Sequence, residues 1–386
     1  MPTLPCQRHL FDVPEDIAYF NSASYSPLLN ASRERLRAGI DGKSHPWTRT
    51  ADDFFEDADR VRQLAAGLFG GDADGYAVVP AASYAASTVA RVLEPALGPG
   101  TRILVIEEEF PSDVLPWRRA ARETGAELVT VPRPDGPWTP AILRHIDRGV
   151  TVVSVSTCHW TNGAAIDVDA VAAACRGAGA ILVLDATQSL GAMPFDMAAT
   201  RPDFLLAAGY KWLLSPYGFG LLWVADRWRD RRPLEESWIT RDNARDFAGL
   251  VHYSEGYRPG ARRFDVGETC VPTLLPGAIA ALEQLRAWGI ASIAETLAGI
   301  TSRLAARLSE RGYVVPPDAE RCPHMFGVGV PGGDPSRLVP ALGARGVYVS
   351  QRGRSLRISP HLHVSAADEA RLLDALDALV PDASCA

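Results

Sequence analysis

The sequence predicts an α/β protein with a mostly parallel sheet and helices on both of its faces. Short apolar runs alternate with amphipathic helical stretches until about residue 260, as they do in chains built from repeated strand–helix units. Two of these runs, 181–184 and 204–208, lead within three residues to Asp185 and Lys211. Apolar runs that stop on a polar residue are typical of buried parallel strands. Both side chains are therefore expected at the ends of neighbouring core strands.

Composition limits the class of protein and its surroundings. The chain has 386 residues, 47% of them hydrophobic and 22% charged, which is ordinary for a globular protein of roughly two domains. Its net charge of −7 argues against a nucleic-acid partner. No apolar stretch approaches the ~18 residues of a membrane span, and the N-terminus does not resemble a signal peptide, so a cytoplasmic location is expected. None of the six cysteines has CxxC spacing, which predicts free thiols and no metal site.

The elements before residue 225 are expected in a regular order. Residues 1–30 are rich in Pro, Ser and Asn and are expected to form an irregular arm. Ser83 stands where a helix N-cap should follow the strand that breaks at Pro80, and Ser112 or Asp113 is expected to cap the next helix. The other expected elements are helices 52–69 and 167–179 and strands 102–106, 151–156, 181–184, 204–208 and 220–224.

The C-terminal third predicts a smaller α/β unit. A long helical region, 276–311, is expected to break or kink near Gly289. Ser365 is expected to cap the last helix. The remaining elements expected here are strands 325–330, 347–350 and 355–359 and helices 335–346 and 366–379.

Lys211 is distinguished by its chemistry. It is the only lysine between Lys43 and the C-terminus, in a chain that otherwise prefers arginine. Since arginine supplies the basic surface, a single lysine in an apolar, glycine-flanked stretch indicates that an amine is needed. An amine can form a Schiff base, whereas a guanidinium cannot.

The region around Lys211 resembles a known cofactor site. Asp185-x-x-Gln188 is followed, 26 positions after Asp185, by Lys211 within Asp203-Phe-Leu-Leu-Ala-Ala-Gly-Tyr-Lys-Trp. This pattern is similar to the pyridoxal 5′-phosphate (PLP) site of class V aminotransferase-fold enzymes, which include cysteine desulfurases, kynureninases and isopenicillin N epimerase-like proteins. The resemblance implies PLP fold type I, with Lys211 forming the imine and shuttling protons. Asp185 would hold the pyridine proton and Gln188 would donate to the phenolate oxygen.

Further cofactor-binding residues follow from the resemblance. Ala82 and Ser83 lie at a strand-to-helix junction that suits a phosphate, although an ordinary capped helix is the alternative. Phe110 within Phe-Pro-Ser-Asp resembles the kynureninase-like branch, where an aromatic ring stacks on the cofactor, and a core phenylalanine is the alternative. By register, His159 is the candidate near the phenolate oxygen, and a surface histidine is the alternative. Tyr210 occupies the position at which kynureninases have a tyrosine that reaches the phosphate.

Two more parts of the site concern a partner subunit and the substrate. Gly267-Glu268-Thr269 resembles the loop that family dimers donate to the neighbour's phosphate, which implies a homodimer with shared active sites. Thr269 stands one place later than the family threonine, so the donor is Thr269 or a backbone N–H. Arg357, just before Ser-Pro-His361, is the candidate for holding the substrate's α-carboxylate, with Arg352 as the second choice.

The resemblance covers nearly the whole chain and implies its organisation and reaction. Residues 1–20 would be the N-terminal arm of the small domain, 21–272 the large PLP-binding domain and 273–386 the C-terminal small domain. In the family, the segment that corresponds to residues 1–30 returns over the active-site mouth, and a plain irregular arm is the alternative. The expected enzyme deprotonates Cα of an α-amino acid and acts as a lyase or epimerase. An aminotransferase and a PLP-binding protein without turnover are the alternatives.

Two other readings of the sequence are disfavoured. The Gly327-x-Gly329-x-x-Gly332 pattern of a nucleotide-binding dehydrogenase lies in a strand-like stretch without the acidic residue that such a site needs. A cysteine desulfurase is not expected, because the interval before Arg357 contains no cysteine. The nearest thiols in sequence are Cys322 and Cys385.

Overall fold

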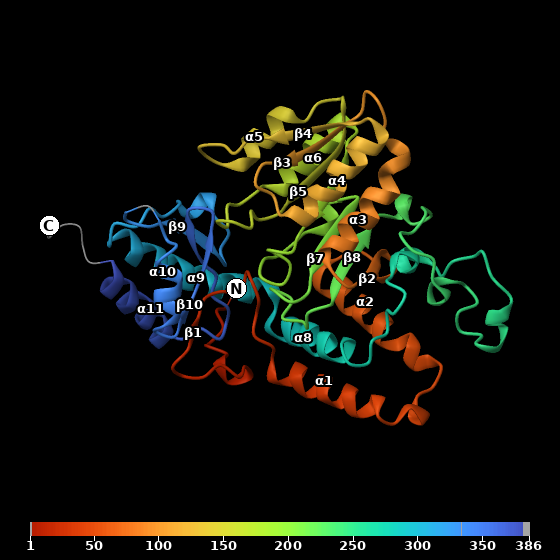
Figure 1. Cartoon of the computed structure of the whole chain (residues 1–386), viewed down its shortest axis with the longest axis horizontal. Coiled ribbons are helices and arrows are strands. Elements are labelled where there is room, and N and C mark those ends of the chain that lie inside the picture. Colours follow the sequence, from red (N-terminus) through yellow and green to blue (C-terminus); the bar gives the residue numbers. More distant parts are fainter. Residues whose placement is uncertain (1, 333, 381–386) are drawn as a thin grey trace.

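The computed structural model describes residues 2–332 and 334–380 and is built around a seven-stranded sheet (Figure 1). The strand order is β2-β8-β7-β6-β5-β3-β4, and among these strands β8 alone runs against the others. The prediction of a mostly parallel sheet is therefore confirmed. The strands are β2 (Tyr76–Val79), β3 (Arg102–Ile106), β4 (Glu127–Val131), β5 (Val150–Ser156), β6 (Ile181–Asp185), β7 (Phe204–Ala208) and β8 (Gly220–Val224).

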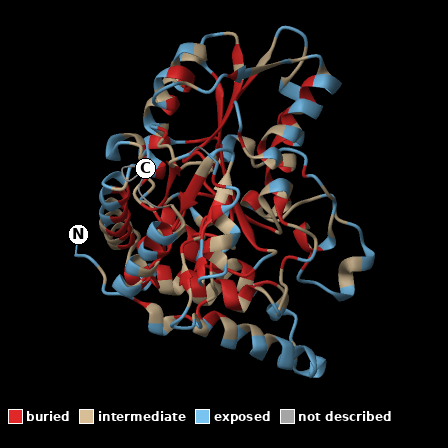
Figure 2. Cartoon of the chain, turned by 60° about the vertical axis from the view of Figure 1, so that its left-hand side comes forward, coloured by how far each residue is buried: buried red, intermediate tan, exposed pale blue. Residues whose placement is uncertain are grey.

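Helices cover both faces of this sheet, so its central strands are buried on both sides (Figure 2). In β6, Ile181 and Val183 pack with helices α3 (Ala82–Leu93) and α4 (Pro111–Thr124). The alternate residues of β6 belong to the core on the opposite face. That face is covered by α2 (Glu56–Phe69), α5 (Trp138–His145), α6 (Val168–Ala178) and α8 (Leu275–Trp288), with the short α7 (Met197–Thr200) beside α6.

The starts of α3 and α4 differ from the predictions. Ala81 is the N-cap of α3, and Ser83 is an exposed residue inside the first turn, so it is not the cap. Phe110 is the N-cap of α4, and neither Ser112 nor Asp113 caps it with a side chain. Pro111 at the first helical position explains this start, because proline needs no N–H partner there. Asp113 is consequently free to face the protein interior.

The C-terminal part forms a smaller α/β unit. Strands β9 (Phe326–Gly329), β11 (Ser350–Arg352) and β12 (Ser355–Ile358) make an antiparallel sheet in the order β11-β12-β9. The predicted helix 276–311 is split at Gly289, whose φ of 78° lies in the left-handed region that favours glycine. Its second half is α9 (Ile290–Ser309), and the other helices are α10 (Leu338–Gly343), shorter than predicted, and α11 (Ala366–Leu379), which Ser365 caps as predicted.

The N-terminal arm joins this smaller unit. Its strand β1 (Ala18–Tyr19) pairs in parallel with β10 (Val347–Tyr348), more than 300 residues away in the chain. The arm then continues into α1 (Asn30–Lys43), which packs along α8 below the large sheet (Figure 1). These contacts agree with an arm that belongs to the smaller unit, while the exact domain boundaries stay a prediction. Among the described residues, no helix combines the length and the apolar character needed to cross a bilayer.

Candidate active site

The candidate site lies at the carboxyl edge of the large sheet. Strands β5, β6 and β7 are parallel neighbours, and Ser156 pairs in register with Asp185, which pairs with Leu206. The residues that follow these strands therefore meet at one edge. Gly209 lets the chain leave β7 there, because a Cβ at this position would lie 2.4 Å from the ring of Phe219 and 2.8 Å from its carbonyl oxygen. Lys211 follows at the start of this turn.

The Lys211 amine is buried and without a polar partner. The residue is 7% exposed, and among the described residues no hydrogen bond or ion pair to Nζ is present. Nζ lies 5.4 Å from the centre of the Phe110 ring and 5.7 Å from that of Tyr210. Burial lowers the pKa of Lys211 to about 8, although the negative charge of Asp185 opposes this effect. A substantial fraction of the amine is therefore neutral near pH 8, as a nucleophile or base requires.

Two carboxyl groups, those of Asp185 and Asp113, lie near this amine, and a third, that of Glu109, lies near both of them. Asp185, at the end of β6, accepts a hydrogen bond from the backbone N–H of Thr187 at 2.8 Å. Asp113 of α4 is buried, and in the described part of the chain no group donates a hydrogen bond to either of its carboxylate oxygens; burial followed by the charge of Asp185 raises its pKa well above the ordinary value. Burial likewise raises the pKa of Glu109 to about 7. The cluster can hold a proton at neutral pH and can also stabilise a cationic ring.

Gln188 is fixed from both ends of its amide. Its Nε2 donates to the carbonyl of Ala23 in the N-terminal arm at 3.1 Å, and its Oε1 accepts from Nε1 of Trp212 at 2.9 Å. The Trp212 bond determines which way the amide points, because an indole N–H can only donate. The second hydrogen of Nε2 remains available to an acceptor in the site.

The loop after β5 directs Trp160 toward the site residues and His159 elsewhere. The His159 ring is buried, stacks on Trp138 of α5 at 5.0 Å and shares a hydrogen bond of 2.8 Å with Oγ1 of Thr161. Burial lowers its pKa to about 4, so it is neutral. The Trp160 ring instead meets Phe110 edge to face at 5.3 Å. A cofactor role for His159 stays a prediction, and Trp160 is a site residue that the sequence analysis did not single out.

The residues predicted to hold a phosphate lie on separate loops. Ala82 and Ser83 form the first turn of α3, where backbone N–H groups and the helix dipole favour an anion. Tyr210 is partly buried and forms an aromatic cluster with Tyr25 and Tyr217 at ring separations of 4.6 to 6.0 Å. Thr269 is buried and donates its hydroxyl to the carbonyl of Val266 within its own loop. Their roles stay predictions.

Two arginines face the site from the smaller unit. Arg357 is 1% exposed and donates through Nη1 to the carbonyl of Trp160 at 2.6 Å and through Nε to Oγ of Ser350 at 3.1 Å. Its Nη2 is buried without a partner. Arg352 is partly buried and lies over the Trp160 ring at 5.7 Å. The charges of both arginines lower the pKa of Lys211, which places both near the amine.

The N-terminal arm contacts two of the residues at the site. The backbone N–H of Ser26 donates to the carbonyl of Tyr210 at 3.1 Å, and Oγ of Ser24 accepts from Arg352 at 3.3 Å. Nothing in the local sequence of this arm signals these contacts, because they join residues that are far apart in the chain. The Gly327-x-Gly329 pattern, in contrast, lies in the antiparallel strand β9 and not in a strand-to-helix turn.

Fold and site together define an α/β protein with a buried amine near carboxyl groups at the carboxyl edge of its sheet. These groups fit a carbonyl cofactor with a basic ring nitrogen and a phosphate, since Asp113 has unpartnered oxygens and the first turn of α3 is open to an anion. The chain belongs to the aminotransferase class-V family, whose model matches residues 42–368. Its cofactor is PLP, and the predicted fold type I is confirmed.

Known proteins similar to this chain carry out different reactions. A kynureninase from Deinococcus radiodurans is 30% identical over 281 residues, 69% of this chain and 65% of that protein. An isopenicillin N epimerase from Streptomyces clavuligerus is 28% identical over 335 residues, 83% of this chain and 84% of that protein. The apo structure of a cysteine desulfurase from Thermococcus onnurineus NA1 has a TM-score of 0.86 at 20% identity and covers 98% of this chain and 99% of its own. Cysteine desulfurases are also among the sequence relatives.

Proposed function

We propose that this chain is a PLP-dependent lyase that acts on an α-amino acid, and that it is not a cysteine desulfurase. The observation that carries the proposal is Lys211, a buried amine with a pKa of about 8 and no competing partner. Bound PLP supplies an electron sink for the bond that breaks at Cα. Arg357 would hold the substrate's α-carboxylate through its unpartnered Nη2.

Each of the chain's own groups has a task in this proposal. The neutral Lys211 amine removes the Cα proton and can return it, since its pKa lies close to the working pH. Asp185, with Asp113 close to it, would hold the proton of the ring nitrogen. Gln188 would donate its remaining amide hydrogen to the phenolate oxygen. The rings of Phe110 and Tyr210 lie next to the amine, and Trp160 packs against Phe110, which would limit the access of water to the proton transfer.

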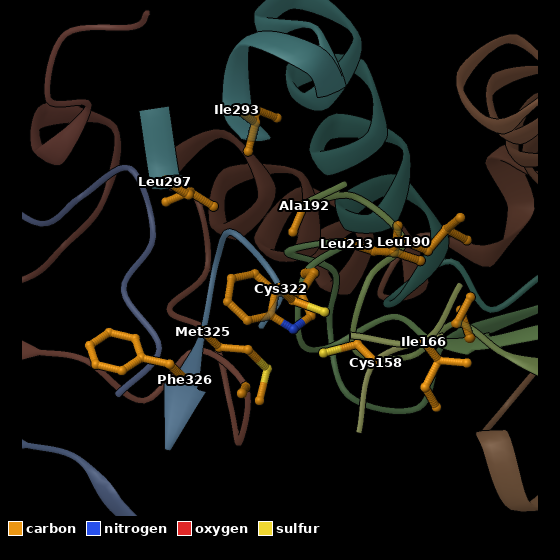
Figure 3. Packing of buried hydrophobic residues seen from close by; sticks show 14 of the residues in the cluster. Cys158, Ile166, Leu190, Ala192, Leu213, Ile293, Leu297, Cys322, Met325 and Phe326 are labelled. Atoms are coloured by element: carbon orange, nitrogen blue, oxygen red, sulfur yellow. The ribbon is translucent and has the colours of Figure 1, made fainter. Parts of the chain in front are cut away.

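The strands that carry the arginines leave no room for a mobile cysteine. One residue separates β10 from β11, two residues connect β11 to β12, and none of the residues from 347 to 357 is a cysteine. Persulfide chemistry needs an accessible thiolate. Cys158 and Cys322 are 0% exposed and lie within a packed apolar cluster (Figure 3). Burial raises the pKa of Cys158 and raises that of Cys270 to about 11, and Cys385 lies outside the described residues.

Epimerisation is the second candidate. It is favoured by the isopenicillin N epimerase relative, because that alignment spans 84% of the relative, compared with 65% for the kynureninase. Both reactions begin with the same proton transfer by Lys211. They differ in whether a side-chain bond then breaks or the proton returns to the other face.

Two measurements test the proposal: the fate of sulfur from L-cysteine and the exchange of the Cα hydrogen. The holoenzyme is incubated with L-cysteine, and its intact mass and products are measured. Elimination gives sulfide, pyruvate and ammonia with unchanged protein mass, whereas a desulfurase gives alanine and a protein 32 Da heavier, a species that vanishes when one cysteine is replaced. A panel of L-amino acids in D₂O then reports Cα–H exchange. If no amino acid exchanges its Cα hydrogen, the proposal fails, and racemised product without elimination establishes the epimerase.

A further inference from the structure

The site contains two positive charges that no acidic side chain balances. In the described part of the chain, neither Arg352 nor Arg357 has a carboxylate within ion-pair distance of its guanidinium. Arg357 is buried and Arg352 is partly buried, whereas the buried Arg62 pairs with Asp59 and Asp265 and the buried Arg321 pairs with Asp318. Because an uncompensated buried charge is costly, an anionic ligand would stabilise the two unpaired arginines.

The hairpin β11–β12 places the two guanidinium groups on one surface. Ser350 pairs directly with Arg357 across the hairpin, and Arg352 stands two residues after Ser350 on the same strand. Residues two apart on a strand share a face, so Arg352 and Arg357 are diagonal neighbours on it. The hydrogen bond from Nη1 of Arg357 to the carbonyl of Trp160, and the position of Arg352 over the Trp160 ring, show that this face is turned toward the loop after β5.

Trp160 lies between the two arginines and the amine. Arg357 donates to its carbonyl oxygen, and Arg352 lies over its ring. The same ring contacts Phe110, whose other contact is the Lys211 amine. Both arginine charges lower the pKa of Lys211. An aromatic wall therefore runs from the reactive amine to Arg352.

We propose that Arg352 is a second anion-binding residue, and that the substrate is an α-amino acid with a further carboxylate at the end of its side chain. This inference rests on the proposed function, in which Arg357 takes the α-carboxylate. The distal carboxylate binds the partly exposed Arg352, and the intervening side-chain atoms lie along Trp160. A dicarboxylic amino acid, or two amino acids joined through their side chains, has this chemistry.

Arg352 also has contacts that a purely structural residue would have. It donates to the carbonyl of Gln351 at 2.7 Å and to Oγ of Ser24 at 3.3 Å, so its loss could loosen the N-terminal arm. A structural role would weaken all ligands alike. A recognition role weakens only ligands that have a second carboxylate, and this difference separates the two explanations.

The first experiment measures binding without turnover. Borohydride-reduced holoenzyme is titrated by calorimetry with aliphatic dicarboxylates of four to seven carbons and with monocarboxylates of the same lengths. We expect the best dicarboxylate to bind at least about tenfold more tightly than its monocarboxylate partner, the size expected of one charge-assisted hydrogen bond. Arg352→Gln should abolish this preference while monocarboxylate affinity changes by less than about twofold. Arg354→Gln, at an exposed position in the same hairpin, is the matched control and should retain the preference.

Two results would overturn the inference: equal binding of both ligand series at every length, or equal weakening of both series by Arg352→Gln. The second experiment compares Cα–H exchange in D₂O for glutamate, 2-aminoadipate and their uncharged amide or alkyl analogues. Faster exchange of the acidic members, lost in Arg352→Gln, supports the inference. A dicarboxylate preference in the reduced enzyme without exchange of any amino acid would refute the proposed function and leave the second anion site standing.

Discussion

The buried ion pair between Arg62 and Asp265 allows a quantitative prediction about stability. Arg62 is 0% exposed and donates to the carbonyl of Tyr76 at 3.0 Å, to Asp59 at 3.0 Å and to Asp265. Asp265 also accepts from the backbone N–H of Val78 at 2.8 Å. The pair thus connects α2, β2 and the start of the loop that contains Thr269.

Replacing Arg62 by alanine leaves Asp265 as a buried charge with one remaining donor. Asp59 stays close to Arg245, Arg258 and Arg262, so its charge remains compensated. Breaking a buried pair in this way costs about 3–5 kcal/mol, a large part of the ~5–15 kcal/mol by which a protein is stable. We therefore expect the free energy of unfolding to fall by that amount at pH 8.

The sign of the pH dependence follows from Asp265. Burial already raises its pKa above the ordinary value, and Arg62 opposes that effect. Without Arg62 the folded-state pKa rises further above the unfolded one, so stability is present at low pH and is lost as pH rises through the folded pKa. The loss of unfolding free energy caused by Arg62→Ala should therefore be larger at pH 8 than at pH 5.

Urea unfolding of the cofactor-free protein at fixed protein concentration measures this deficit. Arg311→Ala is the matched control, because Arg311 contacts both Asp377 oxygens, at 2.7 and 3.0 Å, in a more exposed pair. That variant should lose no more than about 1 kcal/mol. Arg62→Met combined with Asp265→Leu should recover part of the stability, since apolar replacement of both partners is often tolerated. Equal losses in Arg62→Ala and Arg311→Ala, or a deficit independent of pH, would refute this reasoning.

Four further outcomes are expected. Lys211→Ala should lose the covalent bond to PLP while retaining non-covalent binding, and a borohydride-reduced peptide map that places the cofactor on Lys43 would contradict this. In cofactor-free protein, modification of Lys211 by an amine reagent should rise with pH to half its maximum near pH 8, because burial lowers the pKa of Lys211; a midpoint near 10 would disprove its burial. Arg357→Ala should raise KM for amino acids by a factor that corresponds to a loss of about 2–5 kcal/mol of binding free energy, while the protein retains most of its PLP. Unchanged kinetics would reassign the role of Arg357. Light scattering should give the mass of a homodimer, in which we expect loop 267–269 at the interface. A fully active monomer would exclude shared sites.

The sequence predicted those parts of the site that local patterns determine. Asp185 ends one short apolar strand and Lys211 follows the next by three residues, so the strand pattern alone placed them at one edge of the sheet. Phe110, at the start of α4, lies near the amine, and its stacking on the cofactor stays a prediction. In each case the chemistry comes from a residue adjacent to a well-defined element.

Other features near the site depend on long-range packing. Asp113 appeared to be a helix cap, and only the packing of α4 against the sheet shows that it is buried near Asp185. His159 and Trp160 are neighbours in one loop, and the stacking of His159 on Trp138 decides which of them faces Phe110. Such choices rest on contacts between distant elements, and neither spacing nor composition records them.

The position of the N-terminal arm also fixes an order of events during protein synthesis. Ala18 finds its strand partner at Val347, and Ala23 donates its backbone N–H to Ser359, whose codons are read more than 300 residues later. At ~5–20 residues per second the delay is on the order of 20–60 s. The strands of the large sheet are complete at residue 224, well before that time. The arm therefore closes over Lys211 only after the sheet that carries it has been made, so the amine is still uncovered when the sheet first forms.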